Sequence, residues 1–251
     1  MGKKILIIAS NYGLWAEELQ APWDALKKAG HTLQLATYKG ITPLPSQMSM
    51  DPNFVDPKQG YKVNPQEVVD RVNKILDDGE WDHPIKTHDA KMKDYDALVL
   101  VGGAGSALDI AGNMEVHDLV FDAYKSGKTV GALCYAVAAL AFTRDPGNNF
   151  KSVINGKNVT AHPHEWDFVG DHAFHFVRET PTNPNMKLVT NGFVFPLQFM
   201  VEDAVGSRDK VKADAKANRE NPCVVYDKPF VTALSVESSR AFGKKLVEVL
   251  G

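Results

Sequence analysis

The segment Lys128-Thr-Val-Gly-Ala-Leu-Cys134-Tyr-Ala-Val-Ala-Ala-Leu140 contains a junction between a strand and a helix, with a cysteine at the join. Its first half, Thr129 to Leu133, is short, apolar and β-branched at its start, which predicts a buried strand. Its second half, Tyr135 to Phe142, is rich in alanine and predicts a helix. The sequence therefore predicts that Cys134 lies at a tight turn at the carboxyl end of a sheet strand.

A cysteine in this position can act as a nucleophile. The turn holds its side chain out at the sheet edge, where it can meet a substrate, as in the nucleophile elbow of hydrolases. The following helix directs its first free N–H groups and the positive end of its dipole at the same spot. We therefore expect Cys134 to have a lowered pKa and to be partly thiolate at neutral pH. The alternative is that Cys134 is a small buried apolar residue of the core.

The composition is that of an ordinary globular protein. The chain has 251 residues, of which 44% are hydrophobic and 24% charged, and a net charge of −3. It lacks a basic cluster, so nucleic acid is not an expected partner. No apolar run approaches the roughly 18 residues of a membrane helix, so no membrane association is expected. The two cysteines, Cys134 and Cys223, lie far apart in the sequence, which argues for a reducing compartment and predicts a cytoplasmic protein without structural disulfides.

Apolar strands and amphipathic helices alternate along the chain, which predicts one domain over residues 1–251 with a flavodoxin-like, doubly wound and mostly parallel sheet covered by helices on both faces. A long proline-containing insertion at about 39–93 is expected to lie outside that sheet, near the site or a dimer interface. Within it, Asn64-Pro65 opens a predicted helix and Trp81 to Lys93 is predicted to be loop. The other predicted elements are strands at Ile5–Ala9, His31–Thr37, Tyr95–Val101, Val159–Ala161, Cys223–Tyr226 and Phe230–Leu234, and helices at Leu14–Gly30, Ser106–Ile110, Val116–Tyr124, Phe199–Asn218 and Ser238–Leu250.

A glycine-rich turn follows one of the predicted strands directly. Gly102-Gly103-Ala104-Gly105 would let backbone amides approach a ligand closely at the carboxyl end of that strand. The spacing G-x-G-x-x-G is absent and the second strand does not end in an acidic residue, so a dinucleotide site is not predicted. We expect no cofactor and a small-molecule substrate bound at this edge of the sheet.

Acidic and histidine residues at the same edge could handle protons for Cys134. Glu18 lies early in the first helix, where a carboxylic acid near a thiolate would have a raised pKa. Its neighbour Glu17 fits the periodicity equally well. His162 and His164 follow another strand and could serve as an acid or base, whereas their spacing matches no metal motif, so no metal is predicted.

These residues resemble the ThiJ/PfpI superfamily, and within it the branch of heat-shock chaperones and glyoxalase III. Four stretches carry the resemblance: Gly13-Leu-Trp-Ala-Glu-Glu18-Leu-Gln-Ala-Pro22, Gly102-Gly-Ala-Gly105, Ala132-Leu-Cys134-Tyr-Ala and Val159-Thr-Ala-His-Pro-His-Glu165. The resemblance implies that Glu18, and not Glu17, is the active-site acid. It also implies that the backbone amides of Gly103 and Tyr135 bind an oxyanion, and that the protein forms a homodimer.

The chain departs from this branch at Tyr135, because a histidine usually follows the nucleophilic cysteine there. A phenol with a pKa of about 10 is a poor base at neutral pH. Either His162 or His164 replaces that histidine, or the site works as a pair of Cys134 and Glu18. The leading hypothesis is a cysteine-dependent enzyme for small reactive carbonyls or related electrophiles, resembling glyoxalase III, a deglycase or a hydratase. The alternatives are a stress protein, redox sensor or holdase chaperone that uses an oxidisable Cys134, and a hydrolase resembling glutamine amidotransferases.

Overall fold

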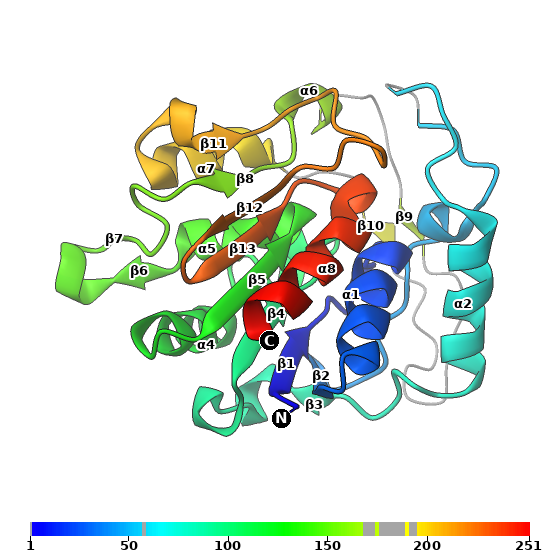
Figure 1. The fold of residues 1–251 in the computed structure, drawn as a ribbon, viewed down its shortest axis with the longest axis horizontal. Coiled ribbons are helices and arrows are strands. Elements are labelled where there is room, and N and C mark those ends of the chain that lie inside the picture. Colours follow the sequence, from blue (N-terminus) through cyan, green and yellow to red (C-terminus); the bar gives the residue numbers. More distant parts are fainter. Residues whose placement is uncertain (1, 57–58, 168–173, 176–188, 191–194) are drawn as a thin grey trace.

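The computed structural model describes residues 2–56, 59–167, 174–175, 189–190 and 195–251. Its centre is a seven-stranded sheet with the order β12-β13-β5-β4-β1-β2-β3 (Figure 1). Neighbouring strands are parallel except for the edge pair β12 and β13, which is antiparallel. The strands are β1 (Lys4–Ile8), β2 (Thr32–Thr37), β3 (Ile85–Lys86), β4 (Ala97–Leu100), β5 (Thr129–Leu133), β12 (Val224–Asp227) and β13 (Phe230–Ala233). The mostly parallel, doubly wound sheet predicted from the alternation of elements is confirmed.

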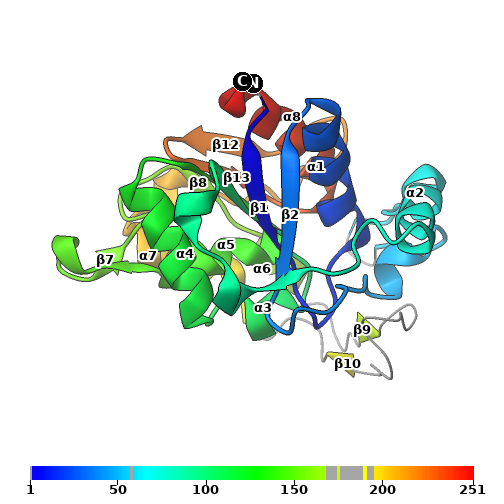
Figure 2. The same ribbon diagram turned by 90° about the horizontal axis from the view of Figure 1, so that it is seen from below.

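Helices cover both faces of this sheet. Figure 2 shows α1 and α8 on one side of the strands and α4 on the other. Strand β4 is apolar and buried throughout, and β5 is apolar and buried after Thr129, as expected for strands covered from both sides. The helices are α1 (Ala16–Lys28), α2 (Gln66–Asp77), α3 (Ser106–Asp109), α4 (Met114–Lys125), α5 (Val137–Phe142), α6 (His164–Asp167), α7 (Leu197–Val205) and α8 (Ser239–Leu250).

Among the described residues, three short strand pairs lie outside the main sheet. One of them, β8 with β11, is parallel and brings the segment before His162 beside the segment after α7. The pairs are β6 (Arg144–Asp145) with β7 (Lys151–Ser152), β8 (Val159–Thr160) with β11 (Val211–Lys212), and β9 (Phe174–His175) with β10 (Val189–Thr190).

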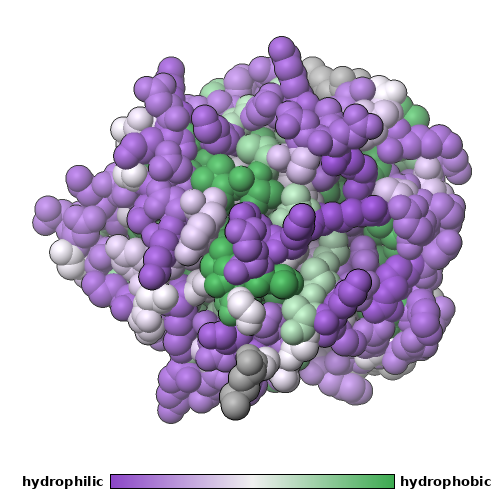
Figure 3. Space-filling model, in the orientation of Figure 1, coloured by the Kyte–Doolittle hydropathy of each residue, from purple (hydrophilic) through white to green (hydrophobic). Residues whose placement is uncertain are grey.

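On the face of the molecule seen in Figure 3, hydrophilic residues cover most of the surface. In the described part of the chain, none of the helices has the length and apolar character needed to cross a bilayer.

Two sequence predictions about elements are wrong. The insertion was predicted to lie outside the sheet, but Ile85 and Lys86 form strand β3, which pairs with the end of β2. The prediction of a helix over 199–218 is also wrong, because α7 ends at Val205 and is followed by Gly206, which has a φ of 76°. A glycine in this left-handed conformation terminates a helix. The charged residues beyond it instead form a short turn and strand β11.

The rest of the insertion packs against the first helix. Arg71 on α2 binds Asp24 on α1 through two hydrogen bonds of 2.7 and 2.9 Å and binds Glu80 at 2.7 Å. The indole N–H of Trp23 donates to Glu80 at 3.2 Å. These contacts fix α2 beside α1, so the insertion is tied to the helix that carries Glu17 and Glu18.

A buried carboxyl group lies in α3, at the carboxyl edge of the sheet. Asp109 is 6% exposed and accepts a hydrogen bond of 2.8 Å from the backbone N–H of Asn11 through its Oδ2. Its Oδ1 has no hydrogen-bond partner among the described residues. Burial is the main cause that raises the pKa of Asp109 to about 6.

We predict that Asp109→Asn stabilises the protein more at pH 7 than at pH 4. The pKa of this carboxyl is about 4 in the unfolded chain and about 6 in the folded protein, so the folded state loses stability as the pH rises through this range. An amide cannot ionise, so the substitution removes that loss. The difference between the two pH values should be about 2–3 kcal/mol, from a shift of about two pH units. Urea unfolding of both proteins at both pH values measures it, and an equal effect of the substitution at both would contradict the prediction.

Candidate active site

The backbone at Cys134 has an unusual conformation. Strand β5 ends at Leu133, a 3₁₀ turn spans Cys134–Ala136, and α5 begins at Val137. Cys134 itself has a φ of 55°, in the left-handed region that non-glycine residues rarely adopt. Such a conformation costs about 1–3 kcal/mol and persists where the surrounding structure enforces it. The thiol therefore lies at the predicted strand-to-helix turn, and its position is imposed by the fold.

The glycine-rich turn after β4 packs directly against this cysteine. A Cβ atom added to Gly102 would lie 2.7 Å from the Cβ of Cys134, and it would also overlap the carboxylate of Glu18 and the carbonyl of Leu133. Gly103 has a φ of 98° and packs on the backbone of Trp15. Glycine is required here because a side chain would separate the thiol from the first helix.

Glu18 and Cys134 form a buried pair. Glu18 is 1% and Cys134 is 5% exposed, and their side chains are joined by a hydrogen bond. Burial raises the pKa of Glu18 well above its ordinary range, and the negative charges of Glu237 and Glu17 raise it further. The Oε2 atom of Glu18 has no hydrogen-bond partner among the described residues. At neutral pH these conditions favour the neutral carboxylic acid.

The pKa of Cys134 is raised, and the prediction of a lowered value is wrong. Burial is the largest cause, and the charge of Glu18 when ionised is the next. The helix that follows is short and begins with a 3₁₀ turn, so its dipole does not outweigh the loss of water. The backbone N–H groups of Gly103 and Tyr135, the two amides predicted to bind an oxyanion, hydrogen-bond to the sulfur and oppose the rise in part.

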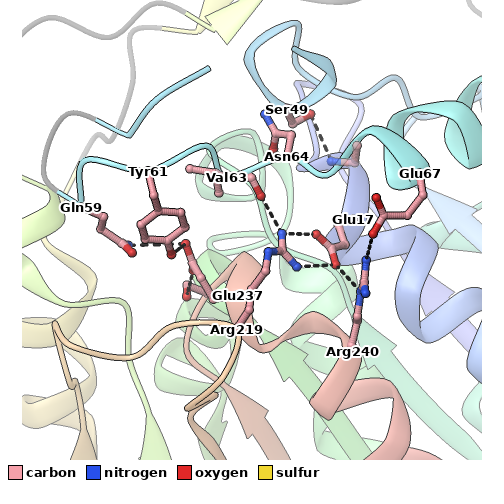
Figure 4. A network of polar contacts seen from close by, with 12 residues as sticks. Glu17, Ser49, Gln59, Tyr61, Val63, Asn64, Glu67, Arg219, Glu237 and Arg240 are labelled. Atoms are coloured by element: carbon pink, nitrogen blue, oxygen red, sulfur yellow. Dashed lines mark hydrogen bonds and ion pairs between the residues drawn. The ribbon is translucent and has the colours of Figure 1, made fainter. Parts of the chain in front are cut away.

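Glu17 has a different environment from Glu18 (Figure 4). It is 1% exposed, and its carboxylate accepts hydrogen bonds from Arg219 at 2.5 and 2.8 Å and from Arg240 at 3.1 Å. Arg219 also donates to the carbonyl of Val63 in the insertion at 2.6 Å. Glu17 is therefore held as an ion pair that joins α1, α8, the insertion and the 219 segment, whereas Glu18 faces the thiol.

Tyr135 lies beside a histidine and an aspartate. Its ring centroid is 5.3 Å from that of His162, and its hydroxyl donates to the carbonyl of Phe195 at 3.0 Å. The Nδ1 atom of His162 lies 2.6 Å from Asp167, whose other oxygen accepts the N–H of Leu197 at 3.1 Å. Burial, followed by the negative charge of Asp167, raises the pKa of Tyr135 well above its usual range, so the phenol stays protonated.

His164 lies further out, on the wall of a cavity. Its Nδ1 is 2.8 Å from Oε1 of Gln198, and its ring stacks on Phe199 with centroids 4.9 Å apart. The cavity has a volume of about 670 Å³ and is lined by residues of the insertion, α6 and the 215–218 segment: Gln59, Tyr61, His164, Glu165, Trp166, Ala215, Lys216, Ala217 and Asn218.

Several residues near the site were missed by the sequence analysis. Asp167 lies five residues after His162, and its proximity in sequence to a candidate histidine was a usable signal. Arg219 and Glu237 come from the last fifth of the sequence, and no local pattern points to them.

Among the described residues, no group of three or more His, Cys, Asp or Glu side chains could hold a metal ion.

Comparison with known proteins identifies a family that this chain matches and a relative of similar sequence. The sequence profile described as the DJ-1/PfpI family matches residues 3–192. The glutathione-independent glyoxalase hsp3102 of Schizosaccharomyces pombe is 24% identical over 180 residues, which cover 65% of this chain and 67% of that protein.

Solved structures have the same fold. Rapid encystment protein 24 kDa of Francisella tularensis has a TM-score of 0.70 and 23% identity, and the match covers 99% of each chain. Glyoxalase III of Candida albicans has a TM-score of 0.68 and 18% identity, with 98% of this chain and 96% of that chain covered. Drosophila melanogaster DJ-1beta has a TM-score of 0.55 and 19% identity, covering 100% of this chain and 91% of that one.

We predict that Glu17→Ala lowers the free energy of unfolding by about 2–4 kcal/mol, because it leaves two arginines without their buried partner. Glu67→Ala is the matched control, since Glu67 binds the same Arg240 at 2.9 Å from an exposed position and should contribute less than about 1 kcal/mol. Chemical denaturation of the three proteins tests this. Similar losses in both variants would show that the burial of Glu17 is not what stabilises the network.

We also predict that Cys134 reacts slowly with iodoacetamide at pH 7 and faster as the pH rises, because only the thiolate is alkylated and the pKa of this thiol is raised. A Cys223→Ser background leaves Cys134 as the single thiol, and labelling is followed by mass spectrometry against glutathione as the reference. A rate at pH 7 above that of glutathione would contradict the raised pKa.

Proposed function

The chain belongs to the DJ-1/PfpI family, and from this premise we propose that it is a cysteine-dependent enzyme acting on small reactive carbonyls such as methylglyoxal, in the manner of glyoxalase III. The observation that carries the proposal is the contact of a buried thiol with a buried carboxylic acid, with two backbone N–H groups directed at the sulfur. The similarity to a curated glyoxalase supports the substrate class.

The arrangement suits addition of a thiol to an aldehyde. The sulfur of Cys134 forms a bond with the aldehyde carbon, and the amides of Gly103 and Tyr135 stabilise the negative charge that develops on the oxygen. A protonated Glu18 can give its proton to that oxygen while its other oxygen takes the thiol proton, so the carboxyl ends the step as it began it. The product is a hemithioacetal on Cys134.

The next step needs a base, and His162 is the residue that we assign to it. The proton on the carbon bound to sulfur moves to the neighbouring ketone carbon, and the hydroxyl proton of the hemithioacetal moves to the ketone oxygen. These two transfers convert the hemithioacetal to a thioester without any external oxidant. Water then releases lactate and regenerates the thiol. His162 is buried beside Tyr135, and Asp167 fixes its ring orientation, as a carboxylate does for a catalytic histidine.

The same pair of residues also supports a redox function. A peroxide can oxidise the thiol of Cys134 reversibly to the sulfenic acid and is itself reduced to water or an alcohol, and the carboxylic acid of Glu18 can donate a hydrogen bond to the sulfenic acid. Under this alternative Cys134 would be needed for stress protection and not for turnover.

The test is lactate formation from methylglyoxal without glutathione. We expect Cys134→Ala to abolish turnover and Glu18→Gln to lower kcat by about 10²–10⁴-fold, the usual contribution of an acid or base. His162→Ala should cause a loss of similar size, while Tyr135→His should gain little because His162 already serves.

His164→Ala is the matched control, because His164 packs on Phe199 at the cavity wall and should change kcat by less than about threefold. If turnover is unchanged in Cys134→Ala, the enzymatic function is wrong and the redox function takes its place. Glutamine hydrolysis in place of lactate formation would favour an amidotransferase-like hydrolase.

A further inference from the structure

Three buried carboxyl groups lie where α1 and α8 meet. Glu17 and Glu18 in the first turn of α1 are each 1% exposed, and Glu237, in the 3₁₀ turn that leads into α8, is 4% exposed. Three negative charges this close together in the interior would repel each other strongly. The structure therefore has to compensate each charge or retain a proton.

The three groups differ in the hydrogen-bond donors that they receive. Glu17 receives two guanidinium groups, as described above. Glu237 receives neutral donors: the hydroxyl of Tyr61 at 2.9 Å, the amide of Gln59 at 3.4 Å and the hydroxyl of Ser235 (Figure 4). Glu18 contacts the thiol, and its Oε2 has no donor among the described residues. Donors favour the ionised form, so Glu17 and Glu237 are the groups suited to carry charge.

We propose that Glu237 is a positioning residue for the reaction: its negative charge acts on the buried carboxyl of Glu18 and so keeps the proton on Glu18. Tyr61 and Gln59 belong to the insertion, which thereby takes part in setting the protonation of the active-site acid. This inference rests on the proposed function, in which Glu18 works as a carboxylic acid.

The protonation state of Glu18 affects the ionisation of Cys134. An ionised Glu18 would face the sulfur and oppose formation of the thiolate, whereas a protonated Glu18 removes that repulsion. Burial then still opposes the thiolate, and the amides of Gly103 and Tyr135 favour it. The charged or titratable groups that face Glu18 are Glu17 on its own helix, Cys134 after β5 and Glu237 before α8. The charge of Glu17 is partly offset by Arg219 and Arg240, whereas the side-chain donors to Glu237 among the described residues are neutral, and Glu237 acts on Glu18 more strongly than Glu17 does.

Infrared difference spectroscopy tests this directly. The carbonyl band of a protonated Glu18 is identified by subtracting the spectrum of Glu18→Gln, and its intensity is followed against pH. In Glu237→Gln, which keeps the size and hydrogen-bonding capacity of the side chain, we expect the band to disappear at a pH lower by about one unit or more, because a nearby like charge has been removed. At a pH between the two midpoints, alkylation of Cys134 should be slower in this variant than in the wild type.

Glu67→Gln is the control, because it removes one negative charge from an exposed position of the same network and should leave the band unchanged. Tyr61→Phe removes one donor to Glu237 and should move the band in the same direction by a smaller amount, which provides a test if Glu237→Gln fails to fold. An unchanged titration of Glu18 in Glu237→Gln or, failing that, in Tyr61→Phe overturns the role of Glu237. If the wild type shows no carboxylic acid band of Glu18 at neutral pH, Glu18 cannot act as the acid of the proposed function. Failure of the proposed function is therefore distinguished from failure of the role of Glu237.

Discussion

The contact between Glu18 and Cys134 is the constraint on which the rest of the site depends. It requires two ionisable groups to be buried against each other, which is tolerated only if they share protons. It also requires the first helix to lie within contact distance of the turn after β5. Gly102 makes that approach possible, since any side chain there would overlap both groups. The left-handed backbone of Cys134 directs the thiol into the same space.

Much of the fold could be predicted because its signals are local. The strand from Thr129 to Leu133 was predicted at its observed bounds, since an apolar run flanked by turn residues has few other interpretations. The helix predicted over 199–218 was wrong because helix-forming residues continue past Gly206, and only the backbone conformation at this glycine ends α7. The strand at Ile85 was missed because two residues are too short for a periodic pattern.

The site was less predictable than the fold. The turn carrying Cys134, the glycine-rich loop and the two helix acids were visible in the sequence, and the choice between Glu17 and Glu18 needed the family resemblance. Burial was not visible, and it reverses the expected direction of the pKa shift of Cys134. The partners of Glu17 and Glu237 come from distant parts of the chain, so a single sequence gives no sign of them.

The bond between Glu17 and Arg219 spans 202 positions of the chain. Arg240, the other partner of Glu17, lies further still towards the carboxyl terminus. During synthesis the first helix leaves the ribosome long before either arginine exists, and a bare carboxylate is too costly to bury without them. The first turn of α1 can therefore dock only after the segments that carry Arg219 and Arg240 have been made. A ribosome-bound nascent chain should therefore form its central strands before Glu18 reaches its position beside Cys134.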